Sequence, residues 1–135
     1  MGVSEMGISV VRAEALQPAA RQTPGSMRFA AIPGATGIAS GLWAGTFQVE
    51  PGAKTGIHHH GAQETVVYVL AGASVVRWGE RGEHQVTVRA GDFLHVPAWV
   101  VHQEINPSAA EPFDWVVVRS SPEPVVVNLA DSVWD

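Results

Sequence analysis

The chain has 135 residues, of which 46% are hydrophobic, and thirteen acidic against eight basic side chains give it a net charge of −5. This length suits a single domain with its own hydrophobic core, and the absence of cysteine excludes disulfides, thiolate nucleophiles and cysteine-ligated zinc. The sequence has no basic patch to neutralise phosphates, no apolar stretch near the roughly 20 residues of a membrane span, and no signal-like N-terminus. We therefore expect neither a nucleic-acid nor a membrane partner, and a cytoplasmic location.

Residues 1–25, which include Pro18 and Pro24, are expected to form an N-terminal arm or edge strand with at most one helical turn near Glu14–Leu16. From residue 26 onward, short runs rich in Val, Ile, Phe and Trp are separated by Gly and Pro about every eight to twelve residues, as is typical of an all-β sandwich or barrel. The expected strands are Met27–Ile32, Leu42–Val49, Thr65–Leu70, Ser74–Trp78, Gln85–Val88, Phe93–Val96, Val100–Ile105, Trp115–Arg119 and Val125–Leu129. Gly79–Glu83 is expected to close a hairpin. The pattern predicts one barrel over residues 26–130 and a C-terminal tail at 131–135.

A cluster of histidines is the most informative feature of the chain. Three are consecutive, His58, His59 and His60, with Glu64 four positions later, and His102 lies about forty residues on. Side chains at positions i and i+2 of a strand share a face, so His58 and His60 are expected to point into the barrel and His59 away from it. Imidazole and carboxylate groups are suitable ligands for a catalytic transition metal.

Two stretches of fixed spacing enclose these histidines. The first reads Gly52-x5-His58-x-His60-x3-Glu64 and leads to Gly72, and the second reads Gly91-x5-Pro97-x4-His102-x3-Asn106. Together they resemble the paired motifs of the cupin superfamily, in particular its small single-domain RmlC-like members. The resemblance implies an antiparallel jelly-roll barrel, a homodimer paired through N-terminal strands and sheet edges, and one divalent metal with four ligands, namely His58, His60, Glu64 and His102.

Two positions depart from the family pattern. Seven residues separate Glu64 from Gly72 where the pattern has six, so counting back from Gly72 places Thr65 at the ligand position. Counting forward from His60 favours Glu64, with a local bulge to absorb the extra residue. The alternative is a three-histidine site with Glu64 or Gln63 beside it. At the second position, Trp99 replaces the motif glycine, and we expect it to have an ordinary φ and to crowd or cover the mouth of the site.

Tyr68 and His95 are the candidate catalytic residues outside the ligand set. Tyr68 is the only tyrosine and has the strand parity of Glu64, so it would also face inward, where its hydroxyl could serve as an acid. His95 shares the parity of Phe93 and is expected either to pack in the core or to line the cavity. Five tryptophans could also wall an apolar pocket.

The leading functional hypothesis is a metal-dependent enzyme acting on a small organic molecule, in the manner of a non-haem metal oxygenase. Iron or manganese is expected, with nickel, copper and zinc left open because their preferred ligands overlap. A net positive site favours an anionic oxygen donor on the substrate. One alternative is a sugar or keto-acid isomerase or epimerase that uses Tyr68 with His95 or Glu64 for proton transfer. The other is a non-catalytic module that binds a small ligand or a metal, since one fold can host many functions.

Overall fold

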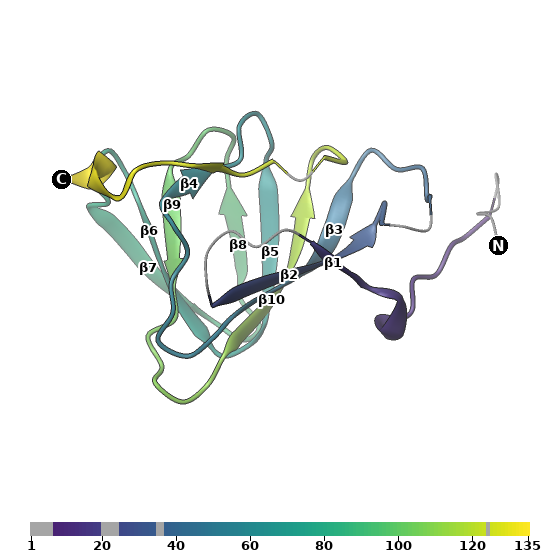
Figure 1. Ribbon diagram of the computed structural model, residues 1–135, viewed down its shortest axis with the longest axis horizontal. Helices are drawn as coiled ribbons and strands as arrows, with labels where there is room; N and C mark the ends of the chain where they lie inside the picture. The colour runs from purple at the N-terminus through teal and green to yellow at the C-terminus, as the bar shows by residue number, and fades with distance from the viewer. Residues whose placement is uncertain (1–6, 20–24, 35–36, 124) are drawn as a thin grey trace.

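The computed structural model describes residues 7–19, 25–34, 37–123 and 125–135, and these form two antiparallel sheets that face each other (Figure 1). One sheet has the strand order β1-β2-β3-β10-β5-β8 and the other β11-β4-β9-β6-β7. In chain order the elements are η1 (Ala13–Ala15), β1 (Gln17–Ala19), β2 (Ser26–Ile32), β3 (Trp43–Val49), β4 (His58–His59), β5 (Thr65–Ala71), β6 (Ala73–Trp78), β7 (His84–Arg89), β8 (Phe93–Val96), β9 (His102–Ile105), β10 (Phe113–Arg119), β11 (Val127–Asn128) and η2 (Asp131–Trp134). The expected all-β jelly roll is confirmed.

The hydrophobic core lies between the sheets and is made by every second residue of the central strands. In β3 and β10 buried and half-buried positions alternate along the full length of each strand, as a period of two requires when one face packs inward. Phe47 of β3 stacks on Trp115 of β10 with ring centroids 5.9 Å apart, and Phe113 packs edge-on against Phe47. Phe47 and Trp115 of this aromatic layer also line a cavity inside the barrel.

Most of the expected strands are present, with shifts of one or two residues at their ends. The hairpin over Gly79–Glu83 joins β6 to β7, with Trp78 opposite His84. The expected strand Val100–Ile105 begins only at His102, and the expected strand Val125–Leu129 is reduced to β11, which pairs with β4. The helical turn expected near Glu14–Leu16 is η1.

The two ends of the described chain are attached to the barrel in different ways. Within the N-terminal arm, β1 pairs with β2 at the edge of the larger sheet; residues 1–6 and 20–24 of that arm lie outside the described residues. The last residues, expected as a tail, instead form η2, which lies at the opposite end of the long axis from η1 (Figure 1). Its Trp134 is buried, donates a hydrogen bond from Nε1 to the Gly79 carbonyl at 3.1 Å, and lies under the Arg77 guanidinium. Among the described residues, no helix has the length and apolar character needed to cross a membrane.

Candidate metal centre

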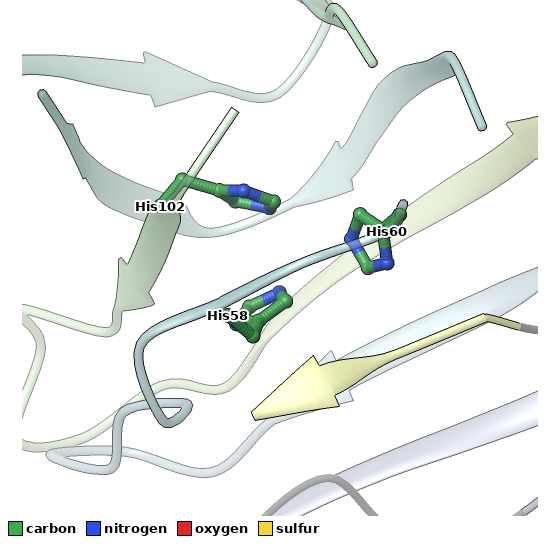
Figure 2. Close-up of side chains that lie close together, drawn as sticks. All are labelled: His58, His60 and His102. Carbon is green, nitrogen blue, oxygen red and sulfur yellow. The ribbon is translucent and has the colours of Figure 1, made fainter. Parts of the chain in front are cut away.

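Three buried histidines converge inside the barrel (Figure 2). His58 lies on β4, directly opposite His102 on β9, and His60 follows β4 by one residue. Their exposed fractions are 0%, 3% and 5% for His58, His102 and His60. One ring nitrogen from each lies within 4.8 Å of the others. The intervening His59 is only half-buried, and its Nδ1 accepts a hydrogen bond from the Gly61 amide, so it belongs to the surface turn.

The backbone fixes which nitrogen of each ring is available. The Nδ1 atoms of His58, His60 and His102 lie 2.7, 2.8 and 2.9 Å from the carbonyl oxygens of Gly56, Val125 and Val100. A carbonyl oxygen only accepts, so each Nδ1 must carry the proton, and each neutral ring keeps the lone pair on Nε2. Nε2 of His58 is buried without a hydrogen-bond partner among the residues that the structure describes. Backbone acceptors that fix the tautomer in this way are what a metal-binding histidine needs, so the three residues fit a metal ion.

Burial keeps two of these rings neutral at physiological pH. Desolvation lowers the pKa of His58 to about 4, partly offset by the negative charge of Glu104. Desolvation also lowers the pKa of His60 to about 2, with the positive charge of Arg119 as the next cause. Neutral imidazoles can bind a cation without first losing a proton.

A carboxylate that the sequence reasoning missed lies next to two of the histidines. Glu104 is two residues beyond His102 on β9 and is 5% exposed. Its Oε2 lies 3.6 Å from Nε2 of both His58 and His102, and it accepts a longer hydrogen bond, at 3.4 Å, from the Thr55 hydroxyl. A separation of 3.6 Å is too long for a hydrogen bond, so Glu104 does not occupy the Nε2 lone pair of either histidine. The strand period could have found Glu104, because it shares a face with His102.

The structure places Glu64 outside the barrel, so the expectation that it faces inward beside His60 is wrong. Its side chain is 58% exposed, and Oε1 forms a 2.6 Å hydrogen bond with Nε2 of His95. The reason is a turn directly after His60. Gly61 has φ of 59°, and the backbone N–H of Gln63 donates a hydrogen bond to the His60 carbonyl. This turn resets the strand parity.

Thr65 takes the inward position instead, as the count back from Gly72 indicated. It is 3% exposed, opens β5 and lines the cavity beside His60. Gln63, the other residue considered for this place, is also buried, but its amide donates hydrogen bonds to Ser121 and Glu123 in the chain segment before β11. Its role is to hold that segment against the barrel.

Both candidate catalytic residues lie on the outer face. The turn at Gly61 shifts Tyr68 outward, and His95 is opposite Val66 in the register of β5 and β8 and shares that face. Tyr68 is 38% exposed and its ring packs 4.8 Å from that of Phe93. His95 has a side chain that is 56% exposed and is paired with Glu64, so it is not a core residue; it is one of the residues that line an outer pocket. Neither residue contacts the space between the three histidines.

Trp99 keeps the backbone conformation of the glycine that it replaces. Its φ is 68°, so the expectation of an ordinary φ is wrong. A hydrogen bond of 2.8 Å from the Trp99 amide to the Gly61 carbonyl helps to hold the chain in this conformation. The indole is 65% exposed and lies 5.8 Å from the ring of His59. It therefore covers the outward histidine rather than the three inward ones.

Two cavities adjoin the histidines. The inner one has a volume of about 20 Å³ and is lined by His60, Thr65, His102, Glu104, Trp115 and Arg119 together with apolar side chains. The outer one has a volume of about 180 Å³ and an almost wholly apolar lining that includes Trp78. Leu94, Val96 and His102 line both, so the cavities lie side by side. Of the five tryptophans, Trp78 lines the apolar outer cavity and Trp115 lines the inner one.

An antiparallel jelly roll with three buried histidines that could hold a metal ion defines a recognisable type of small β barrel. Residues 45–119 match the Cupin domain family, and the chain belongs to that family. The solved structures that it resembles include the polyketide cyclase RemF from Streptomyces resistomycificus, with 20% identity, a TM-score of 0.74 and coverage of 95% of this chain and 91% of the cyclase. Another is a mutant of oxalate decarboxylase from Bacillus subtilis, with 21% identity, a TM-score of 0.71 and coverage of 84% of this chain but only 30% of the decarboxylase. No curated protein matches the chain.

Proposed function

We propose that this cupin is a metal-dependent enzyme that acts on a small organic molecule as a non-haem metal oxygenase. The observation that carries the proposal is the arrangement of His58, His60 and His102, which are buried and keep every Nδ1 engaged with a backbone carbonyl. Three nitrogen ligands leave positions on an ion open to exogenous molecules, which is the ligand arrangement of catalytic rather than structural sites.

Iron or manganese is the metal that we propose, held by the three histidines with Glu104 as the acidic member of the site. When bound, such an ion supplies a Lewis acid and a redox centre that can activate dioxygen. Glu104 would contribute the one buried negative charge in the described part of the chain, and Thr55 would orient it through its hydroxyl. This carboxylate replaces Glu64 in the ligand set that we expected.

The protein's own contribution is a dry, shaped environment beside the ion. Leu94 and Val96 separate the inner cavity from the outer one, and the outer lining offers apolar contacts to the body of a substrate. Such apolar walls favour the apolar part of a ligand over water. Because Tyr68 lies on the outer face and lines neither cavity, the isomerase alternative lacks the hydroxyl that would work with His95 or Glu64.

The comparisons add support at the level of the fold. The two proteins named above are enzymes by their titles, a cyclase and a decarboxylase, so barrels of this shape are compatible with catalysis. At 20 and 21% identity they say nothing about the substrate of this chain.

The first experiment is elemental analysis of protein made without a histidine tag. Wild type should hold close to one equivalent of iron or manganese, His60→Ala should hold almost none, and His59→Ala, which changes the surface neighbour, should match wild type. Metal retained in His60→Ala would overturn the site assignment. Oxygen consumption by the loaded protein with a panel of small organic acids then tests the oxygenase reading, and stoichiometric metal without any turnover would favour the non-catalytic binding module.

A further inference from the structure

The edge of strand β8 that faces away from β5 is free in the described chain. β8 is the last strand of the larger sheet and pairs with β5 alone. Its residues Leu94, His95 and Val96 line the outer cavity, so β8 forms one wall of that cavity. An uncovered strand edge presents backbone N–H and C=O groups that another molecule can pair with.

The hydrogen bonds at the two ends of β5 show which backbone groups of β8 point to its free edge. The Val69 N–H donates to the Asp92 carbonyl, on the side of β8. The Glu64 carbonyl accepts from the Ser120 N–H, on the side of β10. Because successive residues of a central strand bond to opposite neighbours, the odd-numbered residues of β5 bond to β8 and the even-numbered ones to β10. His95 is opposite an even-numbered residue of β5, so its N–H and C=O point away from β5.

His95 therefore presents one donor and one acceptor of its main chain to the outer cavity. Its imidazole lies on the outer face of the sheet, where Nε2 contacts Glu64, so the main chain is the part that adjoins the cavity. No backbone group of the described residues bonds to His95 on that side. Backbone N–H and C=O groups need partners wherever water is displaced. A ligand that offers an acceptor and a donor together is therefore favoured over one that offers neither.

Apolar side chains make the rest of the outer cavity suitable for an uncharged ring. They include Val76 and Trp78 of β6, Val86 of β7, and Leu94 and Val96 of β8. Among the described residues, no lysine, arginine, aspartate or glutamate lines the cavity, so a charged group there would lack a counter-charge. The cavity volume is about 180 Å³, and an apolar cavity of about 150 Å³ holds a benzene molecule. A compact molecule of about one ring therefore fits.

We propose that the outer cavity binds an uncharged molecule of about one ring that carries an amide-type group, and that the backbone of His95 holds the amide. An amide accepts through its carbonyl and donates through its N–H, as a neighbouring strand does. His102 lines the same cavity, so the molecule lies beside the candidate metal centre. The inference rests on the proposed function, since it names the substrate class of that site. The cavity consists of residues of this chain alone, so the molecule binds to the metal-free protein as well.

The first test compares three probes of similar size on metal-free wild-type protein, with binding followed by calorimetry and by NMR spectroscopy of the backbone amides. Benzamide offers a donor and an acceptor, acetophenone replaces the amino group with a methyl group and only accepts, and benzoate is charged. Benzamide should bind saturably and shift the amide resonance of His95. Acetophenone should bind about tenfold more weakly because it lacks one hydrogen bond, and benzoate should not bind measurably.

Two pairs of variants locate the ligand. His95→Pro removes the backbone N–H and should weaken benzamide binding by about tenfold, whereas His95→Ala keeps the main chain and should bind as wild type does. An edge strand tolerates proline where the lost N–H points away from the sheet. Val86→Phe enlarges a side chain of the cavity lining and should abolish binding. Thr87→Phe, at the next and exposed position of β7, is the matched control and should leave binding unchanged.

The outcomes separate this inference from the proposed function. Equal binding of benzamide and acetophenone to wild type, or no binding of benzamide, would overturn it, and these results stand even where His95→Pro does not fold. Wild-type affinity in a folded His95→Pro or in Val86→Phe would overturn it as well. Metal content is measured on the same preparations before the metal is removed. Stoichiometric metal without benzamide binding refutes this inference alone, and benzamide binding to a protein that takes up no metal refutes the proposed function alone.

Discussion

Glu104 and His102 lie two residues apart on β9 and face the same interior, with Oε2 of the first 3.6 Å from Nε2 of the second. The same carboxylate oxygen is 3.6 Å from Nε2 of His58, on the neighbouring strand β4. The acid closest to the histidines is therefore supplied by the strand that carries the distant histidine. It does not come from the turn after His60, where the family pattern places it.

Glu104→Gln is expected to lower the affinity for a divalent metal by about ten- to a hundredfold, the usual cost of losing a supporting carboxylate at a metal site. The substitution keeps the size of the side chain and its hydrogen bond to Thr55 but removes the charge. Equilibrium dialysis with elemental analysis measures the effect. Glu64→Gln is the matched control, because that carboxylate is exposed and paired with His95, and it should leave the affinity unchanged. The reverse ranking of the two variants would return the acidic ligand to Glu64.

The sequence predicts the barrel well because inward and outward residues alternate without a break along the central strands β3 and β10 and over most of β5. The same period of two places Glu104 on the face of His102 and Arg119 on the face of Trp115. The inward positions of Glu104 and Arg119 could therefore have been predicted from the sequence. The turn at Gly61 could not be predicted from the strand period. A parity count assumes an unbroken strand, and one left-handed residue there moves Glu64 and Tyr68 outward and Thr65 inward.

The position of Trp99 shows a second limit. The expected φ followed from the intrinsic preference of a bulky residue. The structure instead retains the left-handed conformation of the motif glycine, where the Trp99 amide bonds to the Gly61 carbonyl. Tertiary hydrogen bonding over-determines such a residue, and the only sign of it in the sequence is that Trp99 stands where the motif has glycine.

The strain at Trp99 predicts an unusual order of stability among its variants. Trp99→Gly and Trp99→Ala both lose the contact of the indole with His59, but only glycine adopts a φ of 68° without steric cost. The left-handed conformation costs other residues about 1 to 2 kcal/mol. We therefore expect the glycine variant to be more stable than the alanine variant by about 1 kcal/mol in urea denaturation. An alanine variant as stable as the glycine variant would show that this φ is not enforced in solution.

Tyr68→Phe is expected to leave metal content and turnover unchanged within about twofold, a difference of less than 0.5 kcal/mol. The hydroxyl is on the outer face, and the ring keeps its contact with Phe93 without it. Steady-state kinetics on the metal-loaded variant checks this. Thr65→Val, an inward change of similar size in the lining of the inner cavity, is the comparison and should lower turnover. Loss of turnover in Tyr68→Phe would revive the isomerase alternative.

The stability of the metal-free protein should fall as the pH drops below about 6.5. Burial lowers the pKa of His58 to about 4 and that of His60 to about 2 from 6.5, so between these values the unfolded chain binds protons that the folded chain does not. Stability therefore rises with pH across this window, by up to about 1.4 kcal/mol per pH unit for each histidine, and levels off above 6.5.

Urea denaturation at half-unit steps from pH 7.5 to 4.5 measures this slope, the pH range being set by the ordinary histidine pKa of about 6.5. His60→Asn is the informative variant, because an amide can still donate to the Val125 carbonyl that Nδ1 of His60 contacts but does not titrate, and its slope should be shallower than that of wild type. A wild-type stability that does not change between pH 7 and 5 would mean that the histidines are not held neutral in the barrel, and with it the case for a preformed metal centre would fail.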